Sequence, residues 1–386
     1  MTTTVLKVGI VANEPSGDML GASLLREIRR RHPGARFEGV GGPLMEAERL
    51  HSLAPMERLS VMGLTEVLRH LPELLAIRSR LRHHFLNDRP DVFVGVDAPD
   101  FNLGLEASLK RAGIPTAHYV SPTVWAWRPG RVKKIRAAAD RVLCIFPFEQ
   151  AFLEQHGVPA VYVGHPLADR IALESDREAA MRQLQITGEQ PVVALLPGSR
   201  RGEVERLAVP FIGAAQHLWQ KRPGVRFVAP FINTATREIF SAELNRRAPD
   251  LPVKVVEGQT QEAMLAADIL LTASGTATLE GLLLKRPMVV AYRLSTVTYA
   301  ILNGLRLIKT PHIAMANLLA GERVVPEFVQ GEATPEALAE ALLRLLDDPE
   351  ECARIKERWL HIHHDLRRNA SQKAAKAVLQ LAEQGV

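Results

Sequence analysis

The chain has 386 residues, 47% of them hydrophobic, with a formal net charge of +5 at pH 7 and an isoelectric point near 9.3. This length favours two domains, and no apolar run approaches transmembrane length. The two cysteines, Cys144 and Cys352, lie far apart, so the sequence predicts neither a disulfide framework nor a cysteine metal cluster, and it indicates a reduced compartment. The positive charge suits nucleic acid, an anionic membrane surface or a phosphorylated substrate, and does not choose among them.

The first half of the chain alternates apolar strands with helical patterns, which is typical of a doubly wound parallel sheet. Its first apolar run has no basic segment before it and predicts a strand, not a signal peptide. Strands are predicted at Lys7–Ala12, Arg36–Val40, Val92–Val96, Thr116–Val120 and Arg141–Ile145, with helices such as Met19–Arg31 and Asn102–Arg111 between them. The alternation pauses after His165 and Pro166, where we expect the domain boundary.

The second half repeats the alternation after a helix predicted at Glu174–Gln185. Strands are predicted at Val192–Leu196, Val225–Ala229, Val253–Val256, Ile269–Thr272 and Met288–Ala291, followed by helices at Pro335–Leu346, Glu350–Leu366 and Ala370–Gln384. We therefore predict an N-terminal domain at 1–167, a second domain at 168–360, and a C-terminal helix at 361–386 that packs back on the N-terminal domain.

The turn after the first strand, Glu14-Pro15-Ser16-Gly17-Asp18, ends in small and polar residues before a helix. Such a turn can meet a phosphate or a sugar, although it lacks the three spaced glycines of the dinucleotide fingerprint. Capping of the following helix by Glu14 fits the spacing equally well.

The segment from Val61 to Phe85 has broad apolar faces flanked by arginines, the pattern of a helix lying in a membrane interface. Pro72 predicts a split into two short helices. The alternative is that this segment packs on the sheet, since a fold of this kind needs several helices in that position. The candidate membrane or lipid contacts are Leu64, Val67, Leu68, Leu71 and Leu75.

Asp97 directly follows the predicted strand Val92–Val96, at the carboxyl end where ligands of open α/β sheets bind. A carboxylate there can accept a proton from a hydroxyl nucleophile. The alternative is that Asp97 caps the next helix, but Asp100, just after Pro99, is the better cap candidate. Because Asp100 can serve as the cap, the pattern favours a functional role for Asp97.

Trp125 and Trp127 lie just before a run of basic residues, a combination that suits single-stranded nucleic acid. The commoner alternative is a solvated helix face beside an aromatic loop. The basic residues are Arg128, Arg131, Lys133, Lys134 and Arg136.

The turn at the middle of the chain contains Gly198, Ser199 and Arg200 and follows the buried strand Val192–Leu196. Its small residues let backbone N–H groups approach a phosphate, and the arginine adds fixed positive charge. Pro210 predicts that the following helix begins near Leu207 or is kinked.

A similar strand–turn–helix follows Ile269–Thr272, where Ser274, Gly275 and Thr276 offer N–H donors to a diphosphate. Glu280 lies about a turn and a half beyond Ser274, where a carboxylate can grip a ribose diol. Capping explains Ser274 and Thr276 equally well, but an acid among leucines is harder to explain as structure.

Five motifs in register resemble bacterial lipid A disaccharide synthases over nearly the whole chain. They are Glu14–Asp18, Val94–Asn102, His118–Arg128, Leu196–Arg200 and Ala273–Glu280. The resemblance implies a GT-B glycosyltransferase, with two Rossmann-like domains whose parallel sheets face a central cleft. It further implies inverting transfer of 2,3-diacylglucosamine from its UDP donor to the 6-hydroxyl of 2,3-diacylglucosamine 1-phosphate, giving lipid A disaccharide 1-phosphate and UDP.

The resemblance also implies roles for single residues. Asp97 matches the general base, Glu14 a residue needed at the cleft, and Arg200 the contact to the donor diphosphate. The nucleotide-binding positions are Gly198, Ser199, Arg200, Ser274, Gly275, Thr276, Glu280 and Asn317. Where the family commonly has Ala-Gly-Glu-Ala, this chain has Ala12-Asn13-Glu14-Pro15. No Asp-X-Asp metal motif is present, and we expect neither a metal nor a cofactor.

The acylated substrates imply an N-terminal domain that binds the acceptor and faces the membrane, and a second domain that binds the UDP-sugar. We expect the protein in the cytoplasm, bound peripherally to the anionic cytoplasmic face of the inner membrane, without a nucleic-acid partner; a homodimer is left open. The alternatives are a UDP-sugar 2-epimerase or an undecaprenyl-linked GlcNAc transferase of the same architecture, and, as a non-enzyme, a single-stranded nucleic-acid-binding protein.

Overall fold

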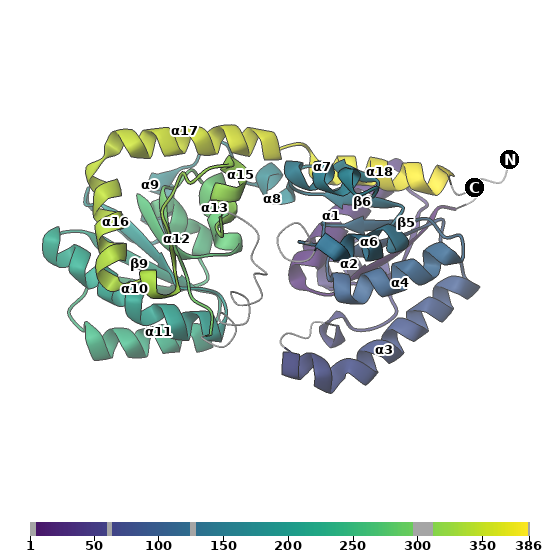
Figure 1. The fold of residues 1–386 in the computed structure, drawn as a ribbon, viewed down its shortest axis with the longest axis horizontal. Helices are drawn as coiled ribbons and strands as arrows, with labels where there is room; N and C mark the ends of the chain where they lie inside the picture. The colour runs from purple at the N-terminus through teal and green to yellow at the C-terminus, as the bar shows by residue number, and fades with distance from the viewer. Residues whose placement is uncertain (1–4, 60–63, 124–128, 296–311, 385–386) are drawn as a thin grey trace. The chain divides into compact units, whose positions relative to one another are not determined.

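The computed structural model describes residues 5–59, 64–123, 129–295 and 312–384. The chain divides into two compact α/β units (Figure 1). Unit 1 comprises Met1–Asp169 together with Leu366–Val386, and unit 2 comprises Arg170–Asp365. Among the described helices, none is long and apolar enough to cross a membrane.

The sheet of unit 1 has seven parallel strands in the order β3-β2-β1-β4-β5-β6-β7. Every residue of the central strand β4 is buried, as expected for a parallel sheet covered by helices on both faces. The strands are β1 Lys7–Ala12, β2 Arg36–Val40, β3 Leu50–Ser52, β4 Val92–Val96, β5 Thr116–Tyr119, β6 Arg141–Cys144 and β7 Ala160–Tyr162. The five strands predicted for this half are confirmed, with ends that differ by at most one residue.

The helices of unit 1 begin mostly at prolines, whose fixed φ and missing N–H suit the first helical turn. They are α1 Pro15–Arg31, α2 Pro43–Ala47, α3 Leu64–Asn87, α4 Pro99–Arg111, α6 Val132–Ala138, α7 Pro147–Gln155 and α8 Pro166–Arg170, the last of which reaches the start of unit 2. Short 3-10 helices η1 and η2 occupy Met56–Arg58 and Pro129–Arg131.

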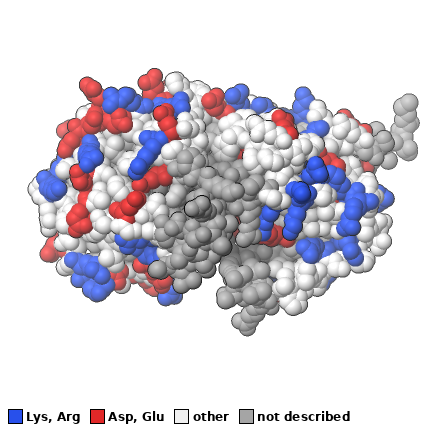
Figure 2. Space-filling model, in the orientation of Figure 1, with Lys and Arg blue, Asp and Glu red and all other residues white. Residues whose placement is uncertain are grey.

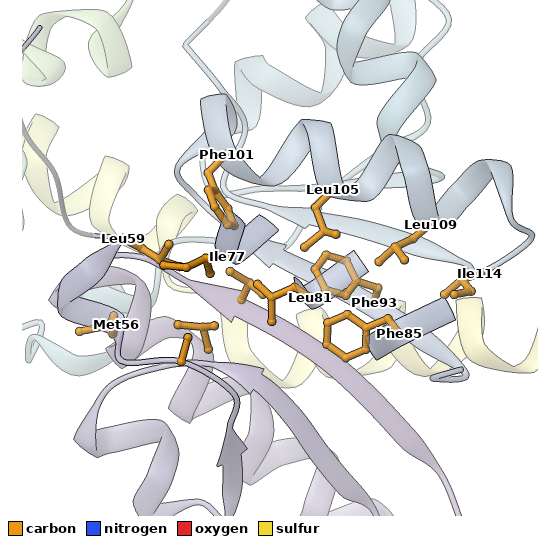
Figure 3. Close-up of a cluster of buried hydrophobic side chains, with 13 residues drawn as sticks. Met56, Leu59, Ile77, Leu81, Phe85, Phe93, Phe101, Leu105, Leu109 and Ile114 are labelled. Carbon is orange, nitrogen blue, oxygen red and sulfur yellow. The ribbon is translucent and has the colours of Figure 1, made fainter. Parts of the chain in front are cut away.

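The predicted break at Pro72 is wrong, because α3 continues from Leu64 to Asn87 with Pro72 inside it. Ile77, Leu81 and Phe85 place one face of this helix in a core shared with β4 and α4 (Figure 3). The ring of Phe85 meets that of Phe93 edge to face, with centroids 5.3 Å apart. Since packing of an apolar face supplies most helical stability in proteins, it outweighs the loss of one backbone hydrogen bond at proline.

The sheet of unit 2 has six parallel strands in the order β10-β9-β8-β11-β12-β13. The strands are β8 Val192–Leu196, β9 Arg226–Phe231, β10 Val253–Glu257, β11 Ile269–Ala273, β12 Met288–Tyr292 and β13 Glu327–Val329. The five predicted strands are again confirmed. β13, like β3 and β7, has three residues and was not predicted, because a segment that short shows no readable periodicity.

The helices of unit 2 are α9 Arg177–Gln183, α10 Arg201–Lys221, α11 Thr234–Arg247, α12 Thr260–Ala266, α13 Thr276–Leu283, α15 Met315–Ala320, α16 Pro335–Asp347 and α17 Pro349–Leu366, with the 3-10 helix η3 at Gln330–Glu332. The expected start of α10 near Leu207 is wrong: the helix begins at Arg201 and contains Pro210. Pro210 is buried between Leu207 and Phe211, so packing again outweighs the missing hydrogen bond.

The C-terminal helix α18, Ala370–Gln384, belongs to unit 1 and packs against α1, β4 and β5. Three hydrogen bonds hold the returning chain: the backbone N–H of His165 donates to Leu366 O at 2.9 Å, and the Asp169 carboxylate accepts from Asn369 N at 2.9 Å and Ala370 N at 2.6 Å. Figure 1 shows α17 leading into α18, both in yellow tones.

Candidate active site

The strand order of unit 1 reverses direction between the neighbouring strands β1 and β4, where Ala12 pairs with Val96. Loops that leave two such strands diverge to opposite faces of the sheet, and the crevice between them is the usual ligand site of an open α/β sheet. Glu14 follows β1 and Asp97 follows β4. The fold therefore brings together the two carboxylates that the sequence analysis singled out.

Asp97 and Ala98 adopt left-handed backbone conformations, with φ of 52° and 42°. For residues other than glycine each such conformation costs about 1–3 kcal/mol and persists only where the surroundings fix it. Here the Asp97 N–H donates to Tyr119 O at 2.8 Å, and the Asn102 amide donates to Asp97 O at 2.9 Å and to Val96 O at 3.2 Å. Strained backbone held this firmly is characteristic of functional sites.

The Asp97 side chain is half-buried and forms no hydrogen bond or ion pair with another described residue. The N-cap position of α4 is Ala98, without a side-chain cap. The expectation that Asp100 caps this helix is wrong, since its side chain is 87% exposed and pairs with Arg131 at 3.4 Å. Asp97 is thus free to accept a proton from a ligand.

Glu14 occupies the N-cap position of α1 but makes no capping hydrogen bond there. It lines a cavity of about 310 Å³ together with Asn13, whose side-chain oxygen is buried and has no partner among the described residues. Leu71, Leu74 and Leu75 of α3 contribute apolar lining to the same cavity. The lining therefore offers contacts both to polar groups and to hydrocarbon.

Asp18 has a structural role in the first motif. Its buried carboxylate accepts hydrogen bonds from the backbone N–H groups of Gly42, Leu44 and Met45 at 2.9–3.0 Å, and so holds the start of α2. Charge-assisted bonds from three donors fix the chain beside β1. Of the acidic residues in the motif, Glu14 alone faces the cavity.

The predicted membrane contacts divide into two groups. Leu71 and Leu75 are 41% and 45% exposed, although they stand on a helix whose other face is core. The side chains of Leu64, Val67 and Leu68 lie outside the described part of the structure, as do Trp125, Trp127 and Arg128 of the tryptophan loop.

The strand order of unit 2 reverses between β8 and β11, where Leu196 pairs with Thr272. The turn carrying Arg200 follows β8, and the turn carrying Ser274 follows β11. The two nucleotide-binding segments expected from the sequence therefore end at the switch point of the second sheet, the counterpart of the crevice in unit 1.

The turn before α10 does not offer a backbone cradle in this structure. The Glu203 carboxylate accepts from the N–H groups of Ser199 and Arg200 at 3.1 and 3.3 Å. Gly198, at φ 128°, leaves room for it, since a Cβ there would lie 2.5 Å from the Glu203 Cβ. The Arg200 guanidinium is 69% exposed and 3.9 Å from Glu203, and it is the part of the turn available to an anion.

The α13 segment begins at Gly275, with φ of 151° and open space where a side chain would lie. Neither Ser274 nor Thr276 caps the helix, because Gly275 holds the N-cap position; the Ser274 hydroxyl donates instead to Ile313 O at 3.0 Å. Glu280 is half-buried, and burial raises its pKa, against the opposing effect of Arg170. A carboxylate among leucines is partly removed from water, and this loss of hydration disfavours its charged form.

Asn317 is fully buried, and its amide is used within the protein. It accepts from Val324 N and Val325 N at 2.9 and 3.0 Å and donates to Val325 O and to Glu327. All donors and acceptors of this side-chain amide therefore have protein partners.

Two residues that hold the candidate site segments in place, one in each unit, were not predicted from the sequence. Glu327 accepts from the N–H groups of Ile313 and Ala314 at 2.9 and 3.1 Å, and so links Asn317 to the segment that Ser274 bonds. In unit 1, Asn102 fixes the backbone of Asp97. Asn102 is the first residue of the predicted helix Asn102–Arg111, where an asparagine is explained by ordinary capping, and its hydrogen-bond partners depend on strand neighbours that the sequence does not reveal.

One group of side chains has the spacing of a metal site within the described ranges: Glu38, His84 and Asp88, whose ligand atoms lie within 4.8 Å of one another. The Lys7 ammonium lies 3.1 Å from Glu38 and also pairs with Asp88, so a protein cation already serves these carboxylates. Lys7 begins β1, at the opposite end of that strand from Glu14.

Comparisons with known proteins fit this arrangement. A profile of the family described as lipid-A-disaccharide synthetase matches residues 8–381. The lipid-A-disaccharide synthase of Pseudomonas aeruginosa (strain UCBPP-PA14) is 54% identical over 378 residues, which cover 98% of each chain.

Solved structures share the fold at low identity. The UDP-GlcNAc 2-epimerase from Neisseria meningitidis, bound to UDP-GlcNAc, has a TM-score of 0.59 at 15% identity over 97% of this chain and 99% of its own. The kitacinnamycin glycotransferase has a TM-score of 0.62 at 18% identity over 98% and 99%. The two parallel-sheet α/β domains are those of the GT-B fold.

Proposed function

This chain belongs to the lipid-A-disaccharide synthetase family, and we propose how its residues divide the reaction of that family between the two units. It is a glycosyltransferase of lipid A biosynthesis, with a sugar-nucleotide donor and a sugar acceptor. The donor is UDP-2,3-diacylglucosamine, and the acceptor is 2,3-diacylglucosamine 1-phosphate. The acceptor binds unit 1 and the UDP moiety binds unit 2.

Asp97 is the general base. Its carboxylate takes the proton of the acceptor 6-hydroxyl as that oxygen bonds to the anomeric carbon of the donor, while the bond from the anomeric carbon to the UDP oxygen breaks and its electron pair leaves with UDP. One in-line displacement inverts the anomeric carbon through an oxocarbenium-like transition state. The support is the unpartnered Asp97 side chain on a backbone fixed by Asn102 and Tyr119.

Glu14 and Asn13 orient the acceptor in the cavity of about 310 Å³. The buried Asn13 oxygen lacks a donor among the described residues, and a hydroxyl or amide N–H of the acylated sugar supplies one. The leucine wall contributed by α3 takes the first carbons of an acyl chain.

The leaving UDP is stabilised by unit 2. Arg200 contacts the diphosphate as negative charge develops on it, and the N-terminus of α13, at Gly275 and Thr276, adds the positive end of its dipole. Glu280 binds the ribose diol. Ser274 and Asn317 act through protein contacts, since they tie Ile313 and Glu327 into a fixed wall beside α13.

The acceptor carries acyl chains and lives in a bilayer, so the enzyme works at the cytoplasmic face of the inner membrane. Exposed Leu71 and Leu75 contact the anionic surface, beside the exposed Arg80 and Arg82 of the same helix. The proposed membrane contact therefore adjoins the cavity that takes the acceptor.

One observation carries the proposal: in each unit the predicted site residues stand at the switch point of the sheet, carboxylates in unit 1 and an exposed arginine in unit 2. The test is an assay with both substrates and mass-spectrometric identification of products. We expect disaccharide 1-phosphate and UDP in equal amounts, and no product without the acceptor. Release of a 2-epimer of the donor, without disaccharide, would overturn the transferase reaction in favour of an epimerase.

A further inference from the structure

Arg78 is a half-buried cation on α3 without an ion pair or hydrogen bond to any described residue. Its guanidinium lies over the bare backbone of α4, since a Cβ at Gly104 would come within 2.7 Å of Nη1. Two acidic side chains of α3 and α4 have other partners: Glu73 pairs with Arg58 at 2.8 Å, and Asp100 with Arg131 at 3.4 Å. Glu14 lines the same cavity as Arg78 but forms no ion pair with it. The Arg78 guanidinium therefore lines two cavities with its hydrogen-bond donors available to an anionic ligand.

Arg78 stands where two cavities of unit 1 meet. The first is the cavity of about 310 Å³ that contains Glu14. The second, of about 340 Å³, has Arg131 and Lys134 on its rim. Arg78, Pro99 and Asp100 line both, so the two form one continuous surface that starts beside the proposed base.

The second cavity is lined by both cationic and apolar side chains. The apolar ones include Leu103, Ala107 and Ile135 of α4 and α6. Figure 2 shows Lys and Arg side chains gathered on the face of unit 1 where Figure 1 labels α4 and α6. Asp100 is the one carboxylate in the lining, and its ion pair offsets part of the charge of Arg131, which leaves Arg78 and Lys134 in excess.

We propose that Arg78, together with Arg131 and Lys134, binds the phosphomonoester of the acceptor. This assignment rests on the proposed function, and it extends the acceptor site from the reacting hydroxyl to the anionic group of the same sugar. A phosphomonoester carries nearly two negative charges and several acceptor oxygens, which match a guanidinium fork flanked by two further cations. The donor diphosphate has its own arginine in unit 2.

The alternative source of the same chemistry is the phosphodiester headgroup of a bilayer lipid. The position of Arg78 argues against it, because the guanidinium is half-buried against α4, whereas Arg80, two residues along the same helix, is exposed and suits a bulk lipid surface. The two sources are separated by measuring acceptor selectivity and vesicle binding in the same variants.

The test compares Arg78→Gln with Arg80→Gln, which removes the same charge from the same helix outside both cavities. kcat/KM is measured for the phosphorylated acceptor and for its dephosphorylated analogue, with donor KM as a further readout. We expect the wild type and Arg80→Gln to prefer the phosphorylated acceptor by roughly 10- to 100-fold, and Arg78→Gln to lose most of that preference with donor KM unchanged. Lys134→Gln should lose a smaller part.

An equal loss of kcat/KM for both acceptors in Arg78→Gln would overturn the proposal, because a general defect does not distinguish the phosphate. A second outcome would also overturn it: Arg78→Gln keeps the acceptor preference but binds phosphatidylglycerol vesicles, without acceptor, more weakly than Arg80→Gln does. That result would assign Arg78 to the bilayer. Failure of the proposed function is separate, since the wild type would then form no disaccharide with either acceptor.

Discussion

At the scale of single residues, the site is built from a few groups whose geometry is unusual. Asp97 was predictable, because a carboxylate directly after a buried strand lies at the ligand edge of a parallel sheet. Its left-handed backbone and its dependence on Asn102 were not, since Asn102 reaches strand ends that become neighbours only in the folded sheet. The motif likewise does not reveal that the Asn317 amide is fully bonded within the protein.

Replacing Asp97 with Asn should lower turnover at least ~10²-fold, because the amide cannot take the proton of the acceptor hydroxyl. Asn tolerates left-handed backbone conformations, so the fold and UDP affinity should be preserved. Steady-state kinetics and UDP titration calorimetry measure the two effects. Near-normal turnover would remove Asp97 as the base.

Arg200→Ala should weaken UDP binding by at least about tenfold, because it removes a charged contact to the diphosphate. Arg201→Ala is the matched control: the next guanidinium is also exposed but pairs with Glu205 at 2.7 Å. Equal UDP affinities for the two variants would contradict the role of Arg200.

Glu280→Gln should stabilise the fold at neutral pH while it weakens UDP binding. Burial raises the pKa of Glu280 above its ordinary value of 4.5, so ionisation costs the folded state free energy, and the stability of the wild type falls as pH rises from about 4.5 through the raised pKa of the folded state. The gain of the glutamine variant should therefore shrink as pH falls towards 4.5 and below. Denaturant unfolding at several pH values checks the sign; a gain independent of pH would place its cause elsewhere.

At the scale of elements, the sequence predicted strands better than helix interruptions. Buried strands show continuous apolar runs between turn residues, and each predicted run is a strand. The predicted break at Pro72 in α3 and the predicted start of α10 near Leu207 were both wrong, because the local rule does not include the tertiary packing of the flanking residues. For the same reason the sequence did not predict β3, β7 and β13. Each of these strands has three residues and is ordered by pairing with a neighbouring strand.

The two faces of α3 should respond differently to polar substitution. Leu71→Ser with Leu75→Ser should reduce binding to anionic vesicles and leave the melting temperature nearly unchanged, because both leucines are exposed. Leu81→Ser, in the core of Figure 3, should lower the stability by about 2–5 kcal/mol. Vesicle sedimentation and thermal melts make the comparison; a collapse of the melting temperature in the double variant would assign Leu71 and Leu75 to the core.

At the scale of the whole molecule, alternating strands and helices predicted two sheets, and the structure has two parallel sheets. The sequence placed the first boundary between residues 167 and 168, and the chain passes from unit 1 to unit 2 between Asp169 and Arg170. The order of strands within each sheet could not be derived from the sequence. It depends on the direction of each crossover, and it determines which turns share a switch point.

Removing α18 should destabilise unit 1 selectively. The helix buries Val378, Leu379 and Leu381, and the loss of their burial alone corresponds to roughly 5 kcal/mol. Hydrogen exchange of the full chain and of a chain ending at Arg368 should show lost protection in β1 and β4 and retained protection in β8 and β11. Lys376→Ala, on the exposed side of α18, serves as the control. Unchanged protection of β1 would mean that unit 1 folds without the helix.

The position of α18 at the end of the chain has a consequence for biosynthesis. Residues 170–365 form unit 2 without interruption, whereas unit 1 needs Leu366–Val386 to complete it. On a ribosome that adds about 5–20 residues per second, the first strand of unit 1 emerges roughly twenty to seventy seconds before the last helix of that unit does. Unit 2 can fold in that interval, while the surfaces of α1, β4 and β5 that α18 will cover stay open to chaperones. The half of the enzyme that is synthesised first is therefore expected to finish folding last.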